Sequence, residues 1–219
     1  MTPQIGIVDY GMGNRRSVEK ALAHAGAQPL ISSDPDALAA TAGLVLPGVG
    51  AFPRAMENLS RLGLAEMLRE RIAAGMPVLG ICLGMQLAFD SSEELGGAAG
   101  LGIVAGRVRA LRAEGLKLPH IGWSEVSFTV PEDPLLAELP DRCAFYHVHS
   151  FAAVPDAPAD TIGTAEYGER FATVVRRGSF HGVQFHPEKS SAAGLRMLGS
   201  FARICAGAVA PAAPGTTPQ

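Results

Sequence analysis

The first ninety residues alternate between short apolar runs and segments whose apolar positions recur at helical spacing. Four apolar runs predict strands: Ile5–Tyr10, Pro29–Ser32, Leu44–Leu46 and Pro77–Ile81. Three other segments predict helices: Ser17–Ala25, Leu62–Ala74 and Leu83–Phe89. Strands that alternate with helices in this way are typical of βαβ units. The pattern therefore predicts an α/β fold around a mostly parallel sheet with helices on both faces.

From about Gly100 the pattern changes to strands with few helices between them. The predicted strands are Ile103–Leu111, Ile121–Val130, Cys143–Ala153, Thr161–Tyr167, Thr173–Arg176 and Gly182–Phe185. Such a series favours antiparallel or mixed pairing, so we expect an additional antiparallel section. A last helix is predicted over Ser191–Ala206, where apolar residues at spacings of three and four form one stripe that packs on the sheet.

Length and composition bound the number of domains. The chain has 219 residues, of which 47% are hydrophobic and 18% charged, as is typical of one folded globular domain. We expect residues 1–206 to form that single domain. Residues 207–219 contain three prolines and no charged side chain, so we expect them to form a flexible C-terminal tail.

Charge and hydropathy exclude several classes of partner. The formal net charge is −3, so no large positive field is present to bind nucleic acid or anionic lipid. The longest uncharged apolar stretch, Ala37–Phe52, is shorter than the ~20 residues that a membrane span needs. The N-terminal segment lacks the cationic and long apolar regions of a signal peptide, which predicts a cytoplasmic protein.

The three cysteines have no C-x-x-C spacing, which argues against a disulfide framework and a zinc site.

The strongest candidate for chemistry is the sequence Gly80-Ile81-Cys82-Leu83-Gly84, which lies between a predicted strand and a predicted helix. A nucleophile flanked by two glycines in this context is typical of the sharp turn on which hydrolases expose a catalytic side chain. The start of the following helix would favour the thiolate of Cys82. The alternative is a buried core cysteine, which is the usual role of an intracellular thiol.

A candidate base and its partner follow the last predicted strand. Pro187 favours extended backbone at His186, so the side chains of His186 and Glu188 can lie near each other. With Cys82 they would form the thiol version of a catalytic triad. Taken alone, a solvated loop histidine beside a surface glutamate is the simpler interpretation. The two motifs together favour catalysis.

Glycine-rich turns follow two of the predicted strands. The turn over Leu46–Phe52 can present backbone N–H groups as an oxyanion hole, with the N–H of Leu83 as a second donor; the alternative is an ordinary βα turn. The turn Gly11-Met12-Gly13-Asn14 is similar to the start of a dinucleotide fingerprint, but Arg16 stands at the third glycine position. Because this third glycine is missing, the turn over Gly11–Asn14 argues against a nucleotide cofactor.

His147 and His149 share a strand face and are the remaining candidates for metal binding. No cysteine or carboxylate cluster accompanies them in the sequence. We prefer a structural role on the sheet face and expect no metal.

Six segments spread over the chain carry a resemblance to a known family. They are Asp9–Asn14, Leu46–Phe52, Gly80–Gln86, Pro119–Trp123, Val148–Ser150 and Gly182–Ser190. In these segments the chain resembles the class I, triad-type glutamine amidotransferases, and more narrowly the glutaminase subunits of imidazole glycerol phosphate synthase of histidine biosynthesis.

The resemblance implies a flavodoxin-like α/β fold and hydrolysis of L-glutamine to L-glutamate and ammonia. Cys82 would attack the side-chain amide and form a γ-glutamyl thioester. His186 would carry the proton, and Glu188 would orient His186. The family pattern has Gly50 supply a backbone contact, so we expect Gly50 and Leu83 to be the oxyanion donors. No metal, nucleotide or flavin is required.

The resemblance also implies a substrate pocket. Its expected members are Gln86, Glu94, Ser150 and Phe151. Of these, the Glu94 carboxylate would suit the substrate ammonium, and Ser150 and Phe151 would contribute mainly backbone groups.

A partner follows from the same resemblance. In the family, ammonia passes through a channel into a separate cyclase subunit, a (β/α)₈ barrel that makes imidazole glycerol phosphate and an aminoimidazole carboxamide ribotide. At 219 residues this chain is too short to contain such a barrel, which takes ~250 residues, in addition to its own domain. We therefore expect a heterodimer, with Trp123 on the face that meets the cyclase and with glutaminase activity that rises when the partner binds its ligand.

Other functions remain open from the sequence. One is a free-standing cysteine hydrolase of γ-glutamyl compounds, or an amidotransferase subunit that serves a different synthase. Another is a non-catalytic scaffold on the same fold, which the presence of Cys82, His186 and Glu188 argues against.

Overall fold

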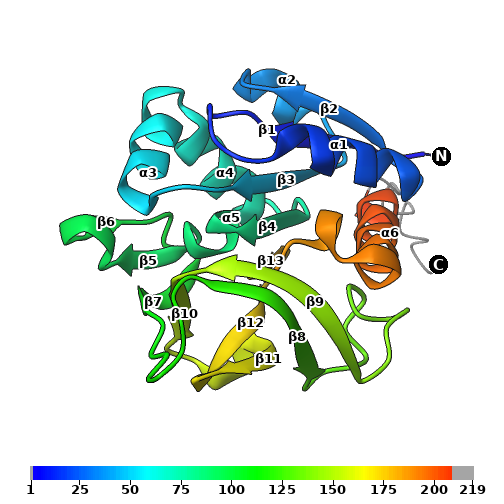
Figure 1. Cartoon of the computed structure of the whole chain (residues 1–219). Coiled ribbons are helices and arrows are strands. Elements are labelled where there is room, and N and C mark those ends of the chain that lie inside the picture. Colours follow the sequence, from blue (N-terminus) through cyan, green and yellow to red (C-terminus); the bar gives the residue numbers. More distant parts are fainter. Residues whose placement is uncertain (1, 209–219) are drawn as a thin grey trace, which may run out of the picture.

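The computed structural model describes residues 2–208, which form a 13-stranded sheet with helices packed on it (Figure 1). One half of the sheet is parallel. Its strands, in spatial order, are β2 (Gln28–Ser32), β1 (Gln4–Val8), β3 (Gly43–Gly48), β4 (Val78–Cys82) and β13 (Phe180–Val183). Because these strands run in the same direction, their carboxyl ends meet at one edge of the sheet.

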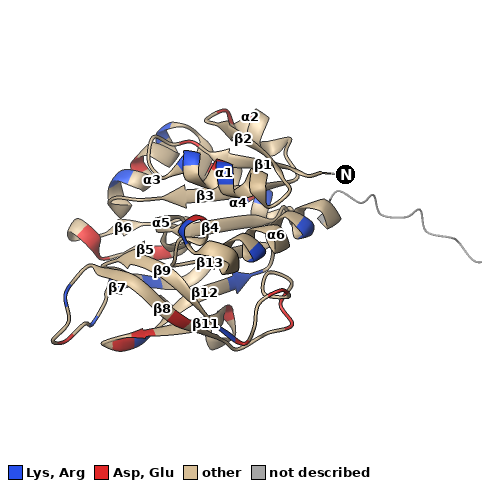
Figure 2. Cartoon of the chain, turned by 45° about the vertical axis from the view of Figure 1, so that its right-hand side comes forward, with Lys and Arg blue, Asp and Glu red and all other residues tan. Residues whose placement is uncertain are grey.

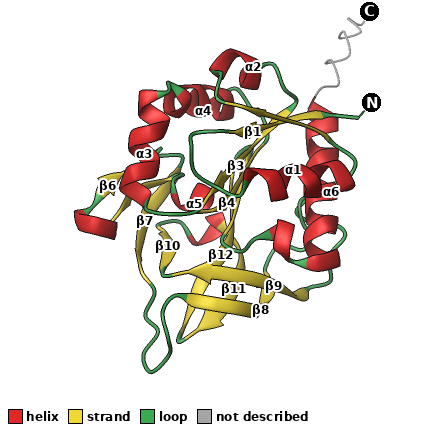
Figure 3. Ribbon diagram, turned by 45° about the horizontal axis from the view of Figure 1, so that its top comes forward, coloured by secondary structure: helices red, strands yellow, loops and turns green. Residues whose placement is uncertain are grey.

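Helices cover both faces of the parallel half. They are α1 (Arg15–His24), α2 (Pro35–Ala39), α3 (Phe52–Arg61), α4 (Leu64–Ala73) and α6 (Ser191–Ala208). Figure 3 shows α1 and α6 on one side of β1, β3 and β4, and α3 and α4 on the other side. The predicted α/β fold with a mostly parallel sheet and helices on both faces is confirmed.

The other half of the sheet is largely antiparallel, as the sequence predicts. Beyond β13 its strands are β12 (Glu169–Arg177), β10 (Phe151–Pro155), β7 (Val104–Ala110), β5 (Phe89–Ser92) and β6 (Ala98–Ala99). Three more branch from β12: β11 (Thr161–Tyr167), β8 (His120–Phe128) and β9 (Arg142–His149). In the part of the chain that the structure describes, β5–β7 is the one parallel pair within this half. The branch curves over the carboxyl end of β4, which brings β9 close to the end of the parallel strands (Figure 1).

Two hydrophobic clusters hold the helices to the sheet, one on each face. Side chains alternate between the two along each strand: Leu79 and Ile81 of β4 belong to the cluster under α1 and α6, whereas Val78 belongs to the cluster under α3 and α4. In α6, the buried side chains of Leu198 and Phe201 fill the first cluster. Strands buried on both faces in this way explain the continuous apolar runs in the sequence.

Several predicted helix limits are wrong. The apolar pattern predicts no helix at α2 or α3, although Pro53 in the first turn of α3 is a favourable helix start. The helix predicted over Leu62–Ala74 begins at Leu64, because Gly63 has a φ of 69° and separates α4 from α3. The helix predicted over Leu83–Phe89 is the short α5 (Leu83–Gln86), since Phe89 already pairs with β7.

Strands and the C-terminus differ as well: β5 and β6 were not predicted, β12 begins at Glu169 and not at Thr173, and β13 covers Phe180–Val183 and not Gly182–Phe185. The strand predicted over Cys143–Ala153 is divided at Ser150 into β9 and β10, and these pair with different neighbours. The last helix continues to Ala208, so residues 207 and 208 are helical and do not belong to a tail. The rest of the predicted tail, residues 209–219, lies outside the described residues. Among the described residues there are also three single turns of 3₁₀-helix: η1 (Glu94–Gly96), η2 (Pro158–Asp160) and η3 (Pro187–Lys189).

Acidic and basic residues are interspersed along the ribbon in the view of Figure 2. This distribution agrees with the formal net charge of −3. None of the helices within residues 2–208 has the length and apolar character of a membrane span.

Packing of α6 on the sheet gives a stability prediction. Phe201 is fully buried against the sheet, whereas Arg196 on the same helix is exposed. We expect Phe201→Ala to lower the free energy of unfolding by about 3–5 kcal/mol, because it leaves a cavity in the core. The matched variant Arg196→Ala is expected to change it by no more than about 0.5 kcal/mol. Urea unfolding of the full chain measures both, and equal midpoints for the two variants would contradict the packing.

Candidate active site

Cys82 occupies a strained turn at the end of β4. Its φ of 54° and ψ of −110° lie outside the regions that side-chain-bearing residues normally adopt. The two flanking glycines are sterically required: a Cβ on Gly84 would lie 1.8 Å from the carbonyl oxygen of Leu46, and a Cβ on Gly80 would lie 2.7 Å from the carbonyl oxygen of Gly84. This close packing of α5 against β3 and β4 gives the sequence Gly80–Gly84 the geometry of a nucleophile turn.

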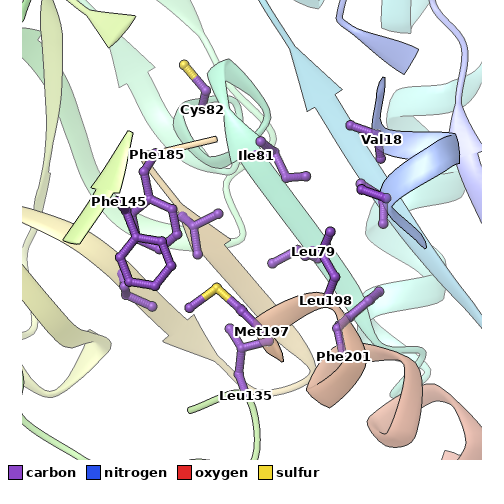
Figure 4. Packing of buried hydrophobic residues seen from close by; sticks show 14 of the residues in the cluster. Val18, Leu79, Ile81, Cys82, Leu135, Phe145, Phe185, Met197, Leu198 and Phe201 are labelled. Atoms are coloured by element: carbon purple, nitrogen blue, oxygen red, sulfur yellow. The ribbon is translucent and has the colours of Figure 1, made fainter. Parts of the chain in front are cut away.

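The Cys82 sulfur points away from the core below it. Figure 4 shows the side chain above Ile81 and Leu79, with the sulfur directed away from the packed residues. The thiol lies 3.7 Å from the carbonyl oxygen of Val148, to which it can donate, and 3.6 Å from Nε2 of Gln184. The residue is 6% exposed, so bulk solvent has little access to its thiol.

His186 and Glu188 lie together, as the sequence predicts for residues two apart. Oε1 of Glu188 accepts from Nδ1 of His186 at 2.9 Å, and both side chains are buried. This bond leaves Nε2 of the imidazole for Cys82. The carbonyl of His186 accepts from the Ser190 hydroxyl at 2.7 Å, which anchors the loop.

The surroundings of His186 favour its charged form. Burial by itself lowers the pKa of His186, but the hydrogen bonds and charges of Cys82 and Glu188 outweigh it and raise the pKa to about 9. At neutral pH the imidazole can therefore hold the proton that a thiolate at Cys82 has given up.

A pocket of about 290 Å³ opens beside Cys82 and His186. The residues predicted from the sequence that line it are Gly50, Cys82, Leu83, Gln86, Glu94, Ser150, Phe151 and His186. Glu188 is the one predicted site residue that does not line the pocket, because it lies behind His186. Residues more than 130 positions apart in the chain are thus brought to the carboxyl edge of the parallel strands.

The glycine-rich turn after β3 forms one wall of this pocket. Gly50 has a φ of 114°, which favours glycine, and a Cβ there would lie 2.6 Å from Cε of Met12. The Tyr10 hydroxyl donates to the Pro47 carbonyl at 2.8 Å and holds the start of the turn. Burial, together with the charge of Cys82, raises the pKa of Tyr10, so it remains a donor.

Glu94 and Phe151 have contacts that limit what they can offer a ligand. Oε2 of Glu94 accepts from the backbone N–H of Phe52 at 2.8 Å, at the first residue of α3. The carbonyl of Phe151 accepts from both Nε2 of Gln86 at 3.1 Å and Nδ1 of His149 at 2.9 Å, so both of its lone pairs are in use.

The helix that follows Cys82 is shorter than the sequence predicts. A helix of four residues, Leu83–Gln86, has a much smaller dipole than the seven-residue helix that the sequence predicts. A helix start of this length therefore gives the thiolate of Cys82 less support than the longer predicted helix would give.

The histidines of β8 and β9 are committed to structural hydrogen bonds. Nε2 of His147 lies 2.9 Å from the Thr173 hydroxyl, and Nδ1 of His120 lies 3.2 Å from Nε2 of His149. Burial lowers the pKa of His147 to about 3 and that of His149 to about 4, so both are neutral. Among residues 2–208, no group of three or more His, Cys, Asp or Glu side chains is arranged to hold a metal ion.

Four further residues lie at the site although the sequence did not predict them there: Tyr10, Pro119, Gln184 and Lys189. Gln184 had a detectable signal. It is a polar residue within an apolar run, two positions before His186, and residues two apart in extended backbone point the same way. Tyr10 gave no such signal, because only the tertiary structure brings its hydroxyl to Pro47.

Comparison with known proteins identifies the family. The family model described as glutamine amidotransferase class-I matches residues 6–204. Imidazole glycerol phosphate synthase subunit HisH of Moorella thermoacetica is 48% identical over 91% of this chain and 94% of its own length. The same subunit of Methylococcus capsulatus is 47% identical over 91% of this chain and 95% of its own.

A solved structure supports the fold assignment. The structure of PurLQS from Thermotoga maritima has a chain that superimposes with a TM-score of 0.75, at 19% identity, over 93% of this chain and 99% of that chain. At that identity the likeness concerns the fold alone. From the sequence relatives and the matched family model, the chain belongs to the class-I glutamine amidotransferases and, within them, to the HisH glutaminase subunits of imidazole glycerol phosphate synthase.

Proposed function

We propose that Cys82, His186 and Glu188 are the catalytic triad with which this glutaminase subunit hydrolyses L-glutamine. The observation that carries the proposal is the placement of Cys82 on a strained turn beside the buried His186–Glu188 pair, whose nitrogen and oxygen are 2.9 Å apart. A thiol, an imidazole and an orienting carboxylate in this order are sufficient for acyl transfer.

In the first half-reaction Cys82 attacks the carbon of the substrate's side-chain amide. The thiol proton moves to His186, and Glu188 stabilises the imidazolium that forms. Backbone N–H groups of Gly50 and Leu83 donate hydrogen bonds to the amide oxygen and stabilise the negative charge that develops on it. Ammonia leaves with the proton from His186, and a γ-glutamyl thioester remains on Cys82.

In the second half-reaction water hydrolyses the thioester. His186 takes a proton from the water and returns it to the sulfur as glutamate departs. Four residues of the pocket wall bind and orient the substrate glutamine: Gln86, Glu94, Ser150 and Phe151. The carboxylate of Glu94 is the member with the charge to pair with the substrate ammonium.

We propose that the ammonia passes to a cyclase subunit, a (β/α)₈ barrel, that docks beside the pocket. Two large apolar side chains project from β8 into solvent, Ile121 at 60% exposure and Trp123 at 53%. They lie close in sequence to Pro119, which lines the pocket itself. An exposed apolar surface on the strand that follows this pocket residue suits a partner that receives the product directly.

The nucleophile is tested by separating the two sources of ammonia. We expect Cys82→Ala, in the complex with the cyclase, to lower glutamine-dependent synthesis by roughly 10⁴–10⁶-fold, the range for loss of a catalytic nucleophile. Synthesis from added ammonium salt should survive, because it bypasses Cys82. The matched variant Cys143→Ala, away from the pocket, should keep glutamine-dependent turnover. Persistent glutamine-dependent turnover in Cys82→Ala would refute the mechanism.

The two other triad members are distinguished by their effect on the pH profile. We expect wild-type turnover to fall as pH rises through about 9, because ammonia release needs the proton held by His186. Glu188→Gln removes a charge that raises this pKa, so the alkaline fall should move to lower pH and the maximal rate should drop. His186→Ala should lose more activity than Glu188→Gln at every pH. Near-wild-type profiles for both variants would exclude the triad.

Partner control of the site is tested with three assays of glutamate production: the chain alone, the chain with the cyclase, and both with the cyclase ligand. We expect low, intermediate and high rates in that order. Glycine-rich backbone at Pro47–Gly50 can take more than one conformation, and one misdirected oxyanion donor costs about 10²–10³ in rate. Full activity of the isolated chain would contradict partner control and favour a free-standing hydrolase.

A further inference from the structure

A buried glutamine touches the nucleophile and has no role in the triad. Gln184 is fully buried, and its Nε2 lies 3.6 Å from the Cys82 sulfur. Its backbone N–H donates to the carbonyl of Thr173 at 2.8 Å, which holds the residue to the neighbouring strand. The other end of its side chain, Oε1, accepts from Nε2 of Gln86 at 2.9 Å.

The orientation of the Gln184 amide follows from its neighbours. The carbonyl of Phe151 can only accept, so the atom of Gln86 that faces it at 3.1 Å must be the nitrogen. That same nitrogen faces Gln184, so the atom of Gln184 on that side must be the oxygen. The opposite end of the Gln184 amide, which faces the Cys82 sulfur, is therefore an N–H donor.

We infer that Gln184 donates an N–H to the Cys82 thiolate and stabilises it, and that Gln86 is a positioning residue which holds the Gln184 amide in that orientation. The inference rests on the proposed function of Cys82 as nucleophile. When the thiol proton moves to His186, the negative charge stays on the sulfur. The contact with the Val148 carbonyl then becomes unfavourable, whereas a hydrogen bond from Gln184 becomes charge-assisted and stronger.

The titratable groups around the sulfur do not already supply the hydrogen bond that Gln184 donates. The titratable groups that line the pocket or lie behind it, from all the elements packed there, are Tyr10, Glu94, His149, His186, Glu188 and Lys189. Of these, His186 takes the proton and Tyr10 donates to Pro47. Within residues 2–208, Gln184 is the neutral side chain whose N–H is hydrogen-bonded to the sulfur.

Alkylation of Cys82 by iodoacetamide tests the donor without any substrate. The rate is measured against pH in the full chain, by mass spectrometry of the peptide that contains Cys82. Burial raises the pKa of Cys143 to about 11 and that of Cys205 to about 12, so neither thiol competes at neutral pH. Gln184→Leu removes the donor, and Gln184→Glu replaces it with an oxygen. Thr173→Val is the control, because it removes a buried hydroxyl from the adjacent strand without touching the sulfur.

Both Gln184 variants are expected to move the alkylation profile to higher pH. At neutral pH the rate should fall by roughly ten- to a hundredfold, the range for a hydrogen bond to a charged group. At alkaline pH, where the thiol is ionised in every protein, the variants should react at least as fast as wild type, because a more basic thiolate is a better nucleophile. Thr173→Val should keep the wild-type profile. A general loss of structure would lower or raise the rate at all pH values and would not produce this crossing.

A variant of Gln86 tests the same inference if the Gln184 variants do not fold. Gln86→Leu leaves Gln184 in place but removes the group that orients it, so we expect a shift in the same direction and of smaller size. Unchanged profiles in the folded variants would overturn the role of Gln184. Failure of the proposed function looks different: wild-type Cys82 would then react no faster at neutral pH than Cys143.

Discussion

The contact between Gly84 and the backbone of Leu46 determines where the chemistry can occur. Because no side chain fits between them, α5 can begin immediately after β4 and lie against the end of β3. This forces Cys82 into a conformation with positive φ and directs its sulfur out of the core. The strain costs free energy of order 1–3 kcal/mol, and the packed clusters on both faces of the sheet maintain it.

A second constraint comes from the carbonyl of Phe151, which connects two hydrogen-bond networks. On one side it accepts from Gln86, which orients Gln184 toward the nucleophile. On the other it accepts from His149, whose second nitrogen is bonded to His120 of β8. His120 of β8 and the Cys82 sulfur are thus joined by buried polar contacts, each with its donor and acceptor determined by a neighbour. A buried network of this kind has few alternative arrangements, because an unpaired polar group there would be costly.

The fold was predictable wherever a local pattern carried the information. Apolar runs bounded by turns located the parallel strands, since strands buried on both faces must be apolar throughout. The length of α5 was not predictable, because Leu87–Phe89 has apolar residues that suit either a helix or a strand, and pairing of Phe89 with Val104 decides the matter. The division of β9 from β10 depends likewise on which neighbour each strand pairs with.

The candidate site shows the same distinction. The sequence alone determined the chemical groups: a thiol between two glycines, and an imidazole two residues from a carboxylate, because these are local motifs. It also indicated the family, since the motifs extend over most of the chain. Only the tertiary structure decided that the Gln184 amide faces the sulfur and that Tyr10 holds the turn at Pro47. The reason is physical: each of these contacts joins residues from different strands, and sheet pairing and packing, not sequence spacing, set the distance between them.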